Sequence, residues 1–488
     1  MRQATILQMK LDAPAIGNIE FDLNSRHEME PILMALKHIY EKPSVLKKIL
    51  DRLAKDILGD SSDKHGCPGL LYWEILVLSA VRIGCNLDYD ALLDLANEHM
   101  KLRRILCIGE WENKHYRRST LQENLAKVTY ETLREISDLV VAEGHQLVPK
   151  AIEKVRGDSV VVETNIHYPT DANLVVDGVR KVVSFAKKLG QLFSLSNWRK
   201  TNSQQKKVKQ LHRQIQQACR SQKPAQQAKA KPLYNELLMV ASDIVTNAFD
   251  FKAKLSFDRL NSVASQRLAN KLAEELDFYI AATLYVSDIA ERRVLNGEKI
   301  PHTEKIFSIF ETHTEMINRG KAPDPWEFGH LLYLVEDQAH FIVDFRILEN
   351  GITEADIMLP QMRQLQRRSK KKIKSASFDQ GFYTPKNLKG LRKIVEVACL
   401  PPKGQPSNEV KEQQKMPTYR AARRRHAGIE SAIHALVWGN GLVRCPDKGL
   451  VGFRRYVALG IVGRNLQTLG TILLKRARRA DARLRLAA

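Results

Sequence analysis

The sequence lacks the features that define several common classes of protein. Its six cysteines are dispersed, with no Cys-x-x-Cys pair and no cluster with histidine, so neither a zinc finger nor a disulfide framework is predicted. We expect free thiols in a reducing compartment at Cys67, Cys85, Cys107, Cys219, Cys399 and Cys445. The longest apolar runs, such as residues 75–81, fall far short of the ~20 residues that a membrane-spanning helix needs.

Other signatures are missing as well. The N-terminus has no apolar segment typical of a signal peptide, so we expect a cytoplasmic protein with no membrane partner. No Gly-rich phosphate loop of either the GxxxxGK[ST] or the GxGxxG type is present, which argues against a nucleotide-hydrolysing helicase. No internal repeat is visible. Hydrophobic residues make up 44% and charged residues 27% of the chain, as in ordinary globular proteins.

What the sequence has in excess is positive charge. Its 488 residues carry 77 Lys and Arg against 55 Asp and Glu, a formal net charge of +22. At roughly 150 residues per domain, the length suggests two to four domains. A chain this basic is expected to bind a polyanion, most often a nucleic acid.

The N-terminal third is predicted to be helical over residues 28–145. Thr120 and Glu123 fit a capping box, and a further helix is predicted from Thr129 to a stop at Gly144. Two short helices joined by a turn are compatible with a helix-turn-helix that binds DNA and equally with plain packing. The sequence leaves both alternatives open.

From Asp158 onward the pattern changes to strands and helices. The β-branched run 159–166 predicts a strand, and apolar residues at helical spacing predict a helical insertion over 172–300. The remaining predicted elements are strands 328–335 and 340–347 as a hairpin, a helix over 353–366, strands 373–379 and 394–400, a linker at 401–417, and a long helix from Thr418.

This order predicts an α/β fold with a mixed sheet flanked by helices. We expect three parts: a helical, DNA-binding N-terminal domain over 1–150, an α/β domain formed by 151–171 and 301–488, and the helical insertion 172–300 within it.

Three carboxylates at the ends of predicted elements are candidates for metal chemistry. Asp158 opens the first predicted strand, Asp379 closes a later one, and Glu430 lies on a helix with apolar neighbours. Phosphodiester cleavage by two metal ions about 4 Å apart needs oxygen ligands such as Asp and Glu. The alternative roles are a turn residue for each Asp and a solvated position for Glu430.

Four segments, in chain order, resemble the motifs of bacterial insertion-sequence transposases of the DDE type. Residues 158–171 resemble the first-Asp motif, in which a strand precedes Tyr-Pro-Thr-Asp. Residues 326–337 resemble the second strand and hairpin, residues 378–382 the second-Asp motif, and residues 423–430 the Glu helix. The helical N-terminal region resembles the amino-terminal domain common in these transposases. The match spans most of the chain, although the insertion matches only loosely.

This resemblance implies an RNase H-like catalytic domain with Asp158, Asp379 and Glu430 as catalytic residues that bind Mg²⁺ or Mn²⁺. Asp171, which follows Tyr-Pro-Thr, competes with Asp158, but its place before a helix predicts an N-cap. The implied activity is cleavage at the terminal inverted repeats of a mobile element and joining of the ends to target DNA. A homodimer on paired ends, associated with the bacterial nucleoid, is also implied. The alternative is a transposase-derived protein that binds specific DNA without cutting it.

The sequence departs from related families beside the Glu. The expected Arg and Lys are replaced by His426 and Val437, and His426, Glu430 and His434 are expected to share one helical face. A zinc site there is the minor alternative to polar neighbours of a carboxylate beside DNA. The side chains predicted to contact DNA are Arg367, Arg368, Lys370, Lys371, Lys372, Arg423, Arg424, Arg425 and His426. Trp198, with Arg199 and Lys200, is predicted either to stack on a base or to be a core residue.

Overall fold

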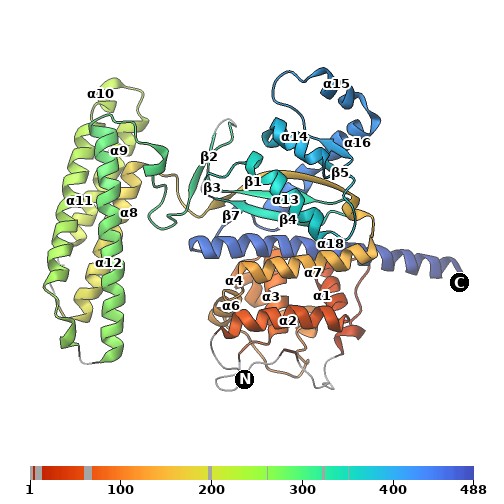
Figure 1. The fold of residues 1–488 in the computed structure, drawn as a ribbon. Helices are drawn as coiled ribbons and strands as arrows, with labels where there is room; N and C mark the ends of the chain where they lie inside the picture. The colour runs from red at the N-terminus through yellow and green to blue at the C-terminus, as the bar shows by residue number, and fades with distance from the viewer. Residues whose placement is uncertain are drawn as a thin grey trace. The chain divides into compact units, whose positions relative to one another are not determined.

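A computed structural model describes residues 4–5, 14–59, 69–195, 201–260, 262–320, 325–349 and 351–487. The predictions made for Cys67, and for Trp198 with its basic neighbours, fall outside these residues. The chain divides into two compact units, coloured along the chain in Figure 1. Unit 1 comprises Met1–Asn165 and Ile317–Ala488, and unit 2 comprises Ile166–Met316.

The N-terminal region of unit 1 is helical, as predicted. Its helices are η1 (Ile16–Asn18), α1 (Met29–Tyr40), α2 (Pro43–Leu58), α3 (Tyr72–Gly84), α4 (Tyr89–Glu98), α5 (Met100–Ile105), α6 (Arg118–Leu125), α7 (Tyr130–Leu147) and η2 (Ala151–Glu153). The Thr129 hydroxyl accepts a hydrogen bond from the Thr132 N–H, so the predicted start of α7 is confirmed.

Two local predictions in this region are wrong. Thr120 does not cap a helix, because α6 already begins at Arg118. Gly144 does not stop α7, which continues to Leu147. A Cβ at Gly144 would lie 2.1 Å from the Phe341 ring, so this glycine is required for close packing of a helix on a loop.

The sheet of unit 1 is mixed, which confirms the predicted α/β class. Over the described residues it has seven strands: β1 (Lys154–Thr164), β2 (Glu315–Asn318), β3 (Trp326–Glu336), β4 (Ile342–Leu348), β5 (Ser375–Ser377), β6 (Val397–Cys399) and β7 (Arg444–Cys445). The long strand β1 is antiparallel to β3, and β3 and β4 form the predicted hairpin. On its other side β1 is parallel to β5, and β5 is parallel to β6.

The remaining helices of unit 1 follow the hairpin. They are α13 (Glu354–Arg368), η6 (Gln380–Phe382), α14 (Pro385–Arg392), α15 (Asn408–Lys415), α16 (Pro417–His426), α17 (Ile429–His434), the π-helical turn η7 (Ala435–Gly439) and α18 (Gly449–Ala487). The predicted linker 401–417 therefore contains a helix. The long helix predicted from Thr418 is broken after His426, where α16 ends before α17 begins.

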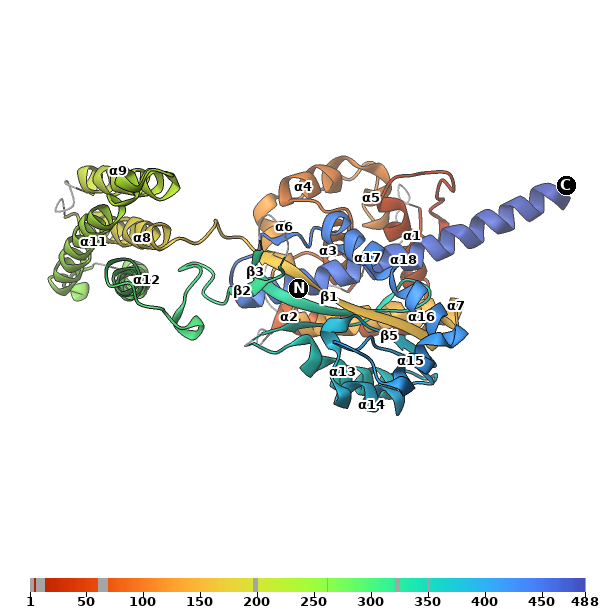
Figure 2. The ribbon, with the colours of Figure 1, turned by 90° about the horizontal axis from the view of Figure 1, so that it is seen from above.

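Helix α18 connects the N-terminal helices to the sheet. It packs against α1, α3, α7 and β4, and its apolar residues belong to the same hydrophobic core as theirs. Gly449–Leu486 contains an 18-residue window with a mean hydropathy of 1.3, so this helix is long and apolar enough to cross a membrane, contrary to the expectation from the short apolar runs. Because 72% of that apolar window is buried within the protein, α18 is accounted for as a core helix. Figure 2 shows its C-terminal end projecting from unit 1.

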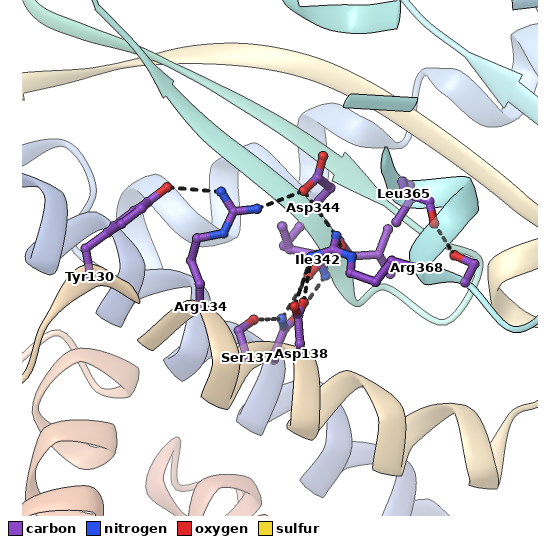
Figure 3. A network of polar contacts seen from close by, with 11 residues as sticks. Tyr130, Arg134, Ser137, Asp138, Ile342, Asp344, Leu365 and Arg368 are labelled. Atoms are coloured by element: carbon purple, nitrogen blue, oxygen red, sulfur yellow. Dashed lines mark hydrogen bonds and ion pairs between the residues drawn. The ribbon is translucent and has the colours of Figure 1, made fainter. Parts of the chain in front are cut away.

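A polar network crosses the junction between α7, β4 and α18 (Figure 3). The buried Asn465 amide on α18 accepts a hydrogen bond from the Ile342 N–H at 2.8 Å and donates to the Ile342 carbonyl and the Ser137 hydroxyl. Close by, Asp344 on β4 binds two guanidinium groups, those of Arg134 on α7 and Arg368 on α13. These bonds satisfy polar groups that would otherwise be buried without partners.

Unit 2 contains the helices predicted between residues 172 and 300. They are α8 (Asp171–Leu192), α9 (Thr201–Arg220), α10 (Pro224–Gln227), α11 (Ala230–Ala253), η3 (Phe257–Arg259), α12 (Val263–Ala290), the π-helical turn η4 (Glu291–Leu295) and η5 (His302–Glu304). Helices α8, α9, α11 and α12 share a separate hydrophobic core, in which the apolar residues at helical spacing in α8 and α9 are buried. Asp171 is not the N-cap of α8. Thr170 is the cap, and Asp171 pairs with Arg293 at 3.1 Å.

Replacing Asn465 by alanine should destabilise unit 1 by about 2–4 kcal/mol, because the Ile342 N–H and carbonyl would lose buried partners. Urea unfolding followed by circular dichroism measures this loss. Gln364→Ala on the exposed side of α13 is the matched control and should change the unfolding midpoint little. Equal midpoints for the two variants would contradict a structural role for the Asn465 amide.

Candidate active site

The sheet register brings two of the predicted catalytic carboxylates together. Arg156 of β1 is opposite Ser377 of the parallel strand β5. Two residues further along each chain are Asp158 and Asp379, and neighbouring strands lie about 4.8 Å apart. Strand β5 ends at Ser377 while β1 continues to Thr164, so Asp379 leaves the sheet beside Asp158. Ligand sites of α/β sheets form at such carboxyl ends of parallel strands.

Asp158 was predicted to open the first strand, and this prediction is wrong because Asp158 lies inside β1. Strand β1 begins earlier, at Lys154. A Cβ at Gly157 would lie 2.2 Å from the Phe378 ring, so the glycine lets that ring pack directly on β1. Phe378 in turn packs against Phe382, and both rings are fully buried. This aromatic contact fixes the backbone on both sides of Asp379.

A third carboxylate, which the sequence analysis missed, lies beside Asp158. Glu354 is the first residue of α13, and its side chain accepts a hydrogen bond from the Ser159 hydroxyl. A Cβ at Gly381 would lie 2.3 Å from the Glu354 carboxylate, so the second-Asp segment is also in contact with it. The only signal in the sequence was the Thr353 cap, which locates the start of the helix but not its neighbours.

Asp158 is in an environment that disfavours its charge. Burial raises its pKa from the ordinary value of 3.8 to about 6, and the negative charges of Asp379 and Glu354 add to the rise. The N–H of Ser159 donates a hydrogen bond to Asp158 at 2.8 Å and opposes that rise, as does His426. A bound cation would relieve the repulsion among these carboxylates.

Asp379 is held by two side chains of α16. His426 Nε2 is 3.3 Å and Arg423 Nη1 is 3.4 Å from Asp379 Oδ1. The hydrogen bond from His426, followed by that from Arg423, lowers the pKa of Asp379 against the effect of burial. The His426 ring is buried, and its Nδ1 has no hydrogen-bond partner among the described residues. The predicted DNA contact at His426 therefore faces a carboxylate inside the site.

Among the described residues, no hydrogen bond or ion pair joins Glu430 to this pair, although α17 packs against β1. It lies exposed in the first turn of α17, and among the described residues it makes no hydrogen bond or ion pair. The break between α16 and α17 also removes the continuous helical face assumed for His426, Glu430 and His434. Within the part of the chain that the structure describes, no three His, Cys, Asp or Glu side chains converge on a point that could hold a metal ion.

The donor chemistry nevertheless fits a hard divalent cation at Asp158 and Asp379. Both groups offer carboxylate oxygens, which Mg²⁺ and Mn²⁺ prefer, and the Arg423 guanidinium already provides a positive charge against Asp379. Two of the three predicted ligands are thus neighbours, whereas Glu430, the third, lies on the separate short helix α17.

Arg156 links the sheet to the helix that carries Arg423 and His426. Its buried guanidinium pairs with Glu336 of β3 and donates to the Arg425 carbonyl of α16 at 2.7 Å. A Cβ at Gly428 would lie 2.2 Å from Arg156 Nη1. Gly428, which lies between α16 and α17, is therefore in close contact with this guanidinium. Arg156 therefore fixes where α16 ends relative to β1.

The predicted DNA-contacting side chains fall into two groups. Several are engaged within the protein: Arg368 pairs with Asp138 and Asp344, Lys372 with Glu396, and Arg425 donates to the Val155 carbonyl. The others are exposed, with no ion pair among the residues whose placement is described: Arg367, Lys370, Lys371 and Arg424. The exposed group is the one available to a polyanion.

No protein-family model matches the chain, and neither a curated protein nor a solved structure is significantly similar to it.

Removing the Asp158 charge should stabilise the protein in a pH-dependent way. The raised pKa means that the contribution of this carboxyl to stability is present below pH 3.8 and is lost as the pH rises through about 6. Asp158→Asn should therefore raise the free energy of unfolding by up to about 3 kcal/mol above the folded-state pKa.

Thermal unfolding over a pH series measures this effect, and the gain should shrink as the pH falls below 6. Glu430→Gln removes a carboxylate from an exposed position and serves as the matched control. A gain that is independent of pH, or that Glu430→Gln reproduces, would contradict the raised pKa.

Proposed function

We propose that this protein is a metal-dependent transposase that cleaves the DNA ends of a mobile element and joins them to target DNA. The observation that carries the proposal is the proximity of Asp158, inside β1, to Asp379, just beyond the end of the parallel strand β5. These are the two residues that the resemblance to DDE transposases selects from separate segments of the sequence. Their convergence in the fold supports that selection over a chance match.

The architecture around the pair gives further support. The central strand β1 has an antiparallel pair of strands on one side and two parallel strands on the other. This arrangement is compatible with the RNase H-like catalytic domain implied by the resemblance. Asp171, the competing residue, is paired with Arg293 in unit 2, which supports the choice of Asp158.

The residues at and around the site suggest separate roles in metal binding, positioning of the carboxylates and phosphate binding. Asp158 and Asp379 would hold Mg²⁺ or Mn²⁺, with Glu430 as the third predicted ligand; the metal supplies charge stabilisation and activation of water. Ser159 orients Glu354 beside the pair, and His426 holds the Asp379 carboxylate in place. Lys370 and Lys371 on the surface would bind phosphates of double-stranded DNA.

The partners and setting belong to the same proposal. The double-stranded DNA would comprise terminal inverted repeats and a target site, bound by a homodimer with the help of the N-terminal helices. The site of action would be the nucleoid of a bacterial cytoplasm.

One observation favours a second candidate, a transposase-derived protein that binds DNA without cutting it. Within the described ranges, Glu430 and the other two carboxylates do not form a three-ligand site. In this alternative, the basic surface remains useful while the metal site is never completed. The two candidates differ in one measurable property, metal-dependent nicking.

Purified protein should nick labelled DNA that carries the gene's flanking sequence when Mg²⁺ is present and not when EDTA replaces it. Asp158→Asn and Asp379→Asn should reduce nicking at least ~10³-fold while DNA binding persists, because an amide is a poor ligand for a hard cation. Asp243→Asn, at an exposed position on α11, is the matched control and should cut normally.

Glu430→Gln separates the two candidate functions from each other. Loss of nicking in this variant would assign Glu430 to the site despite its position in the structure. Specific binding without nicking by the unaltered protein, under several metals and salts, would favour the non-catalytic candidate. Full activity of Asp379→Asn would exclude the proposed mechanism.

Lys370 and Lys371 should contribute to DNA affinity through phosphate contacts. Replacing both by glutamine should lower the dependence of log affinity on log salt by about two units, since each phosphate contact contributes ~0.9. Fluorescence anisotropy of a labelled duplex across a salt series measures the slope. Lys374→Gln removes a lysine that already pairs with Glu153 and should change the slope much less. A slope unaffected by the double change would place the DNA elsewhere.

A further inference from the structure

A hollow of about 560 Å³ opens in the surface of unit 1 next to the candidate site. It is lined by Pro401, Gln414, Tyr419, Arg420, Arg423 and Arg424. Three of these six residues are arginines and none is acidic, so the hollow is a concentrated positive region. We call it the arginine hollow.

The arginine hollow is built into the fold. Tyr419 lies on α16, which packs against β6 and its last residue, Cys399. Pro401 follows the same strand, and the neighbouring Pro402 carbonyl accepts a hydrogen bond from the Gln380 amide, one residue after Asp379. The wall of the hollow follows the end of β6, and Asp379 follows the end of the neighbouring strand β5.

The three arginines differ in their partners. The side chains of Arg420 and Arg424 are exposed and, in the described part of the chain, have no ion pair or hydrogen bond. Arg423 also lines the hollow, but its guanidinium is in contact with Asp379 at 3.4 Å. Arg423 is thus shared between the hollow and a predicted metal ligand.

We propose that the arginine hollow binds a phosphate group of a DNA strand, and that Arg423 leaves Asp379 to do so, which frees this carboxylate for a divalent cation. Guanidinium groups bind phosphate in a bidentate manner, and three of them with no acidic neighbour in the lining favour a polyanion. In the absence of DNA, Arg423 occupies the place of the cation. Binding of DNA and binding of metal are then coupled in both directions.

This inference rests on the proposed function. It adds an order of binding, in which DNA binds first and the metal ion then binds more tightly. The expected coupling is modest. Both partners of the Arg423–Asp379 pair are about half exposed, at 47% and 53%, so the contact is screened by water. Removing it should tighten metal binding by about two- to fivefold, the range for exposed ion pairs.

The test is the affinity of the full-length protein for Mn²⁺, measured by electron paramagnetic resonance with and without a short duplex. Without DNA, Arg423→Gln should bind Mn²⁺ about two- to fivefold more tightly than the unaltered protein. Adding the duplex should tighten Mn²⁺ binding in the unaltered protein and much less in Arg423→Gln. Asp379→Asn should abolish this Mn²⁺ binding, which assigns the signal to the site.

Arg424→Gln is the matched control, because it removes the same charge from the same hollow without touching Asp379. It should leave the affinity for Mn²⁺ unchanged in the absence of DNA. Each of the two arginine variants should also lower the salt dependence of DNA binding by about one unit. Equal Mn²⁺ affinities for Arg423→Gln and Arg424→Gln would overturn the inference.

The failure of this inference differs from the failure of the proposed function. A protein that nicks DNA and binds Mn²⁺ equally well with and without the duplex is a transposase without the Arg423 coupling. A protein that neither nicks DNA nor binds Mn²⁺ in the presence of the duplex fits neither proposal.

Discussion

The buried guanidinium of Arg156 is the constraint on which the candidate site depends. It is neutralised by Glu336 on β3 and donates to the end of α16, so it joins the sheet to the helix that carries His426 and Arg423. A buried ion pair is expensive to desolvate and tolerates little displacement, because either partner left alone would be an unpaired charge. The position of α16 over the strand ends is thereby fixed, and with it the partners of Asp379.

The sequence predicted those parts of the fold that depend on local pattern. Apolar spacing located α8, α9 and the N-terminal helices, and β-branched runs located β1 and the β3–β4 hairpin. It failed where a long-range contact decides the local structure. Gly144 was predicted to end a helix and Asp158 to open a strand, whereas Gly144 and Gly157 each make room for an aromatic ring from a distant segment. The break after His426 has the same origin, since Gly428 lies against Arg156.

The candidate site was predictable to the same extent. Motifs selected Asp158 and Asp379, and the parallel register of β1 with β5 places them side by side. Glu354 could not be found, because its proximity follows from the path of α13 and from no spacing in the chain. The clusters of Lys and Arg could be recognised in the sequence. Which cations are already neutralised, such as Arg368, depends on carboxylates from other elements.

The position of α18 in the chain has a consequence for biosynthesis. Unit 1 is assembled from two segments separated by unit 2, and its core includes a helix that follows all its other elements in sequence. During translation, part of the apolar surface of the N-terminal helices stays exposed until α18 has been synthesised and can pack against it. Unit 2 is contiguous and can close its own core earlier. Shielding by chaperones is therefore most important for the N-terminal helices during synthesis.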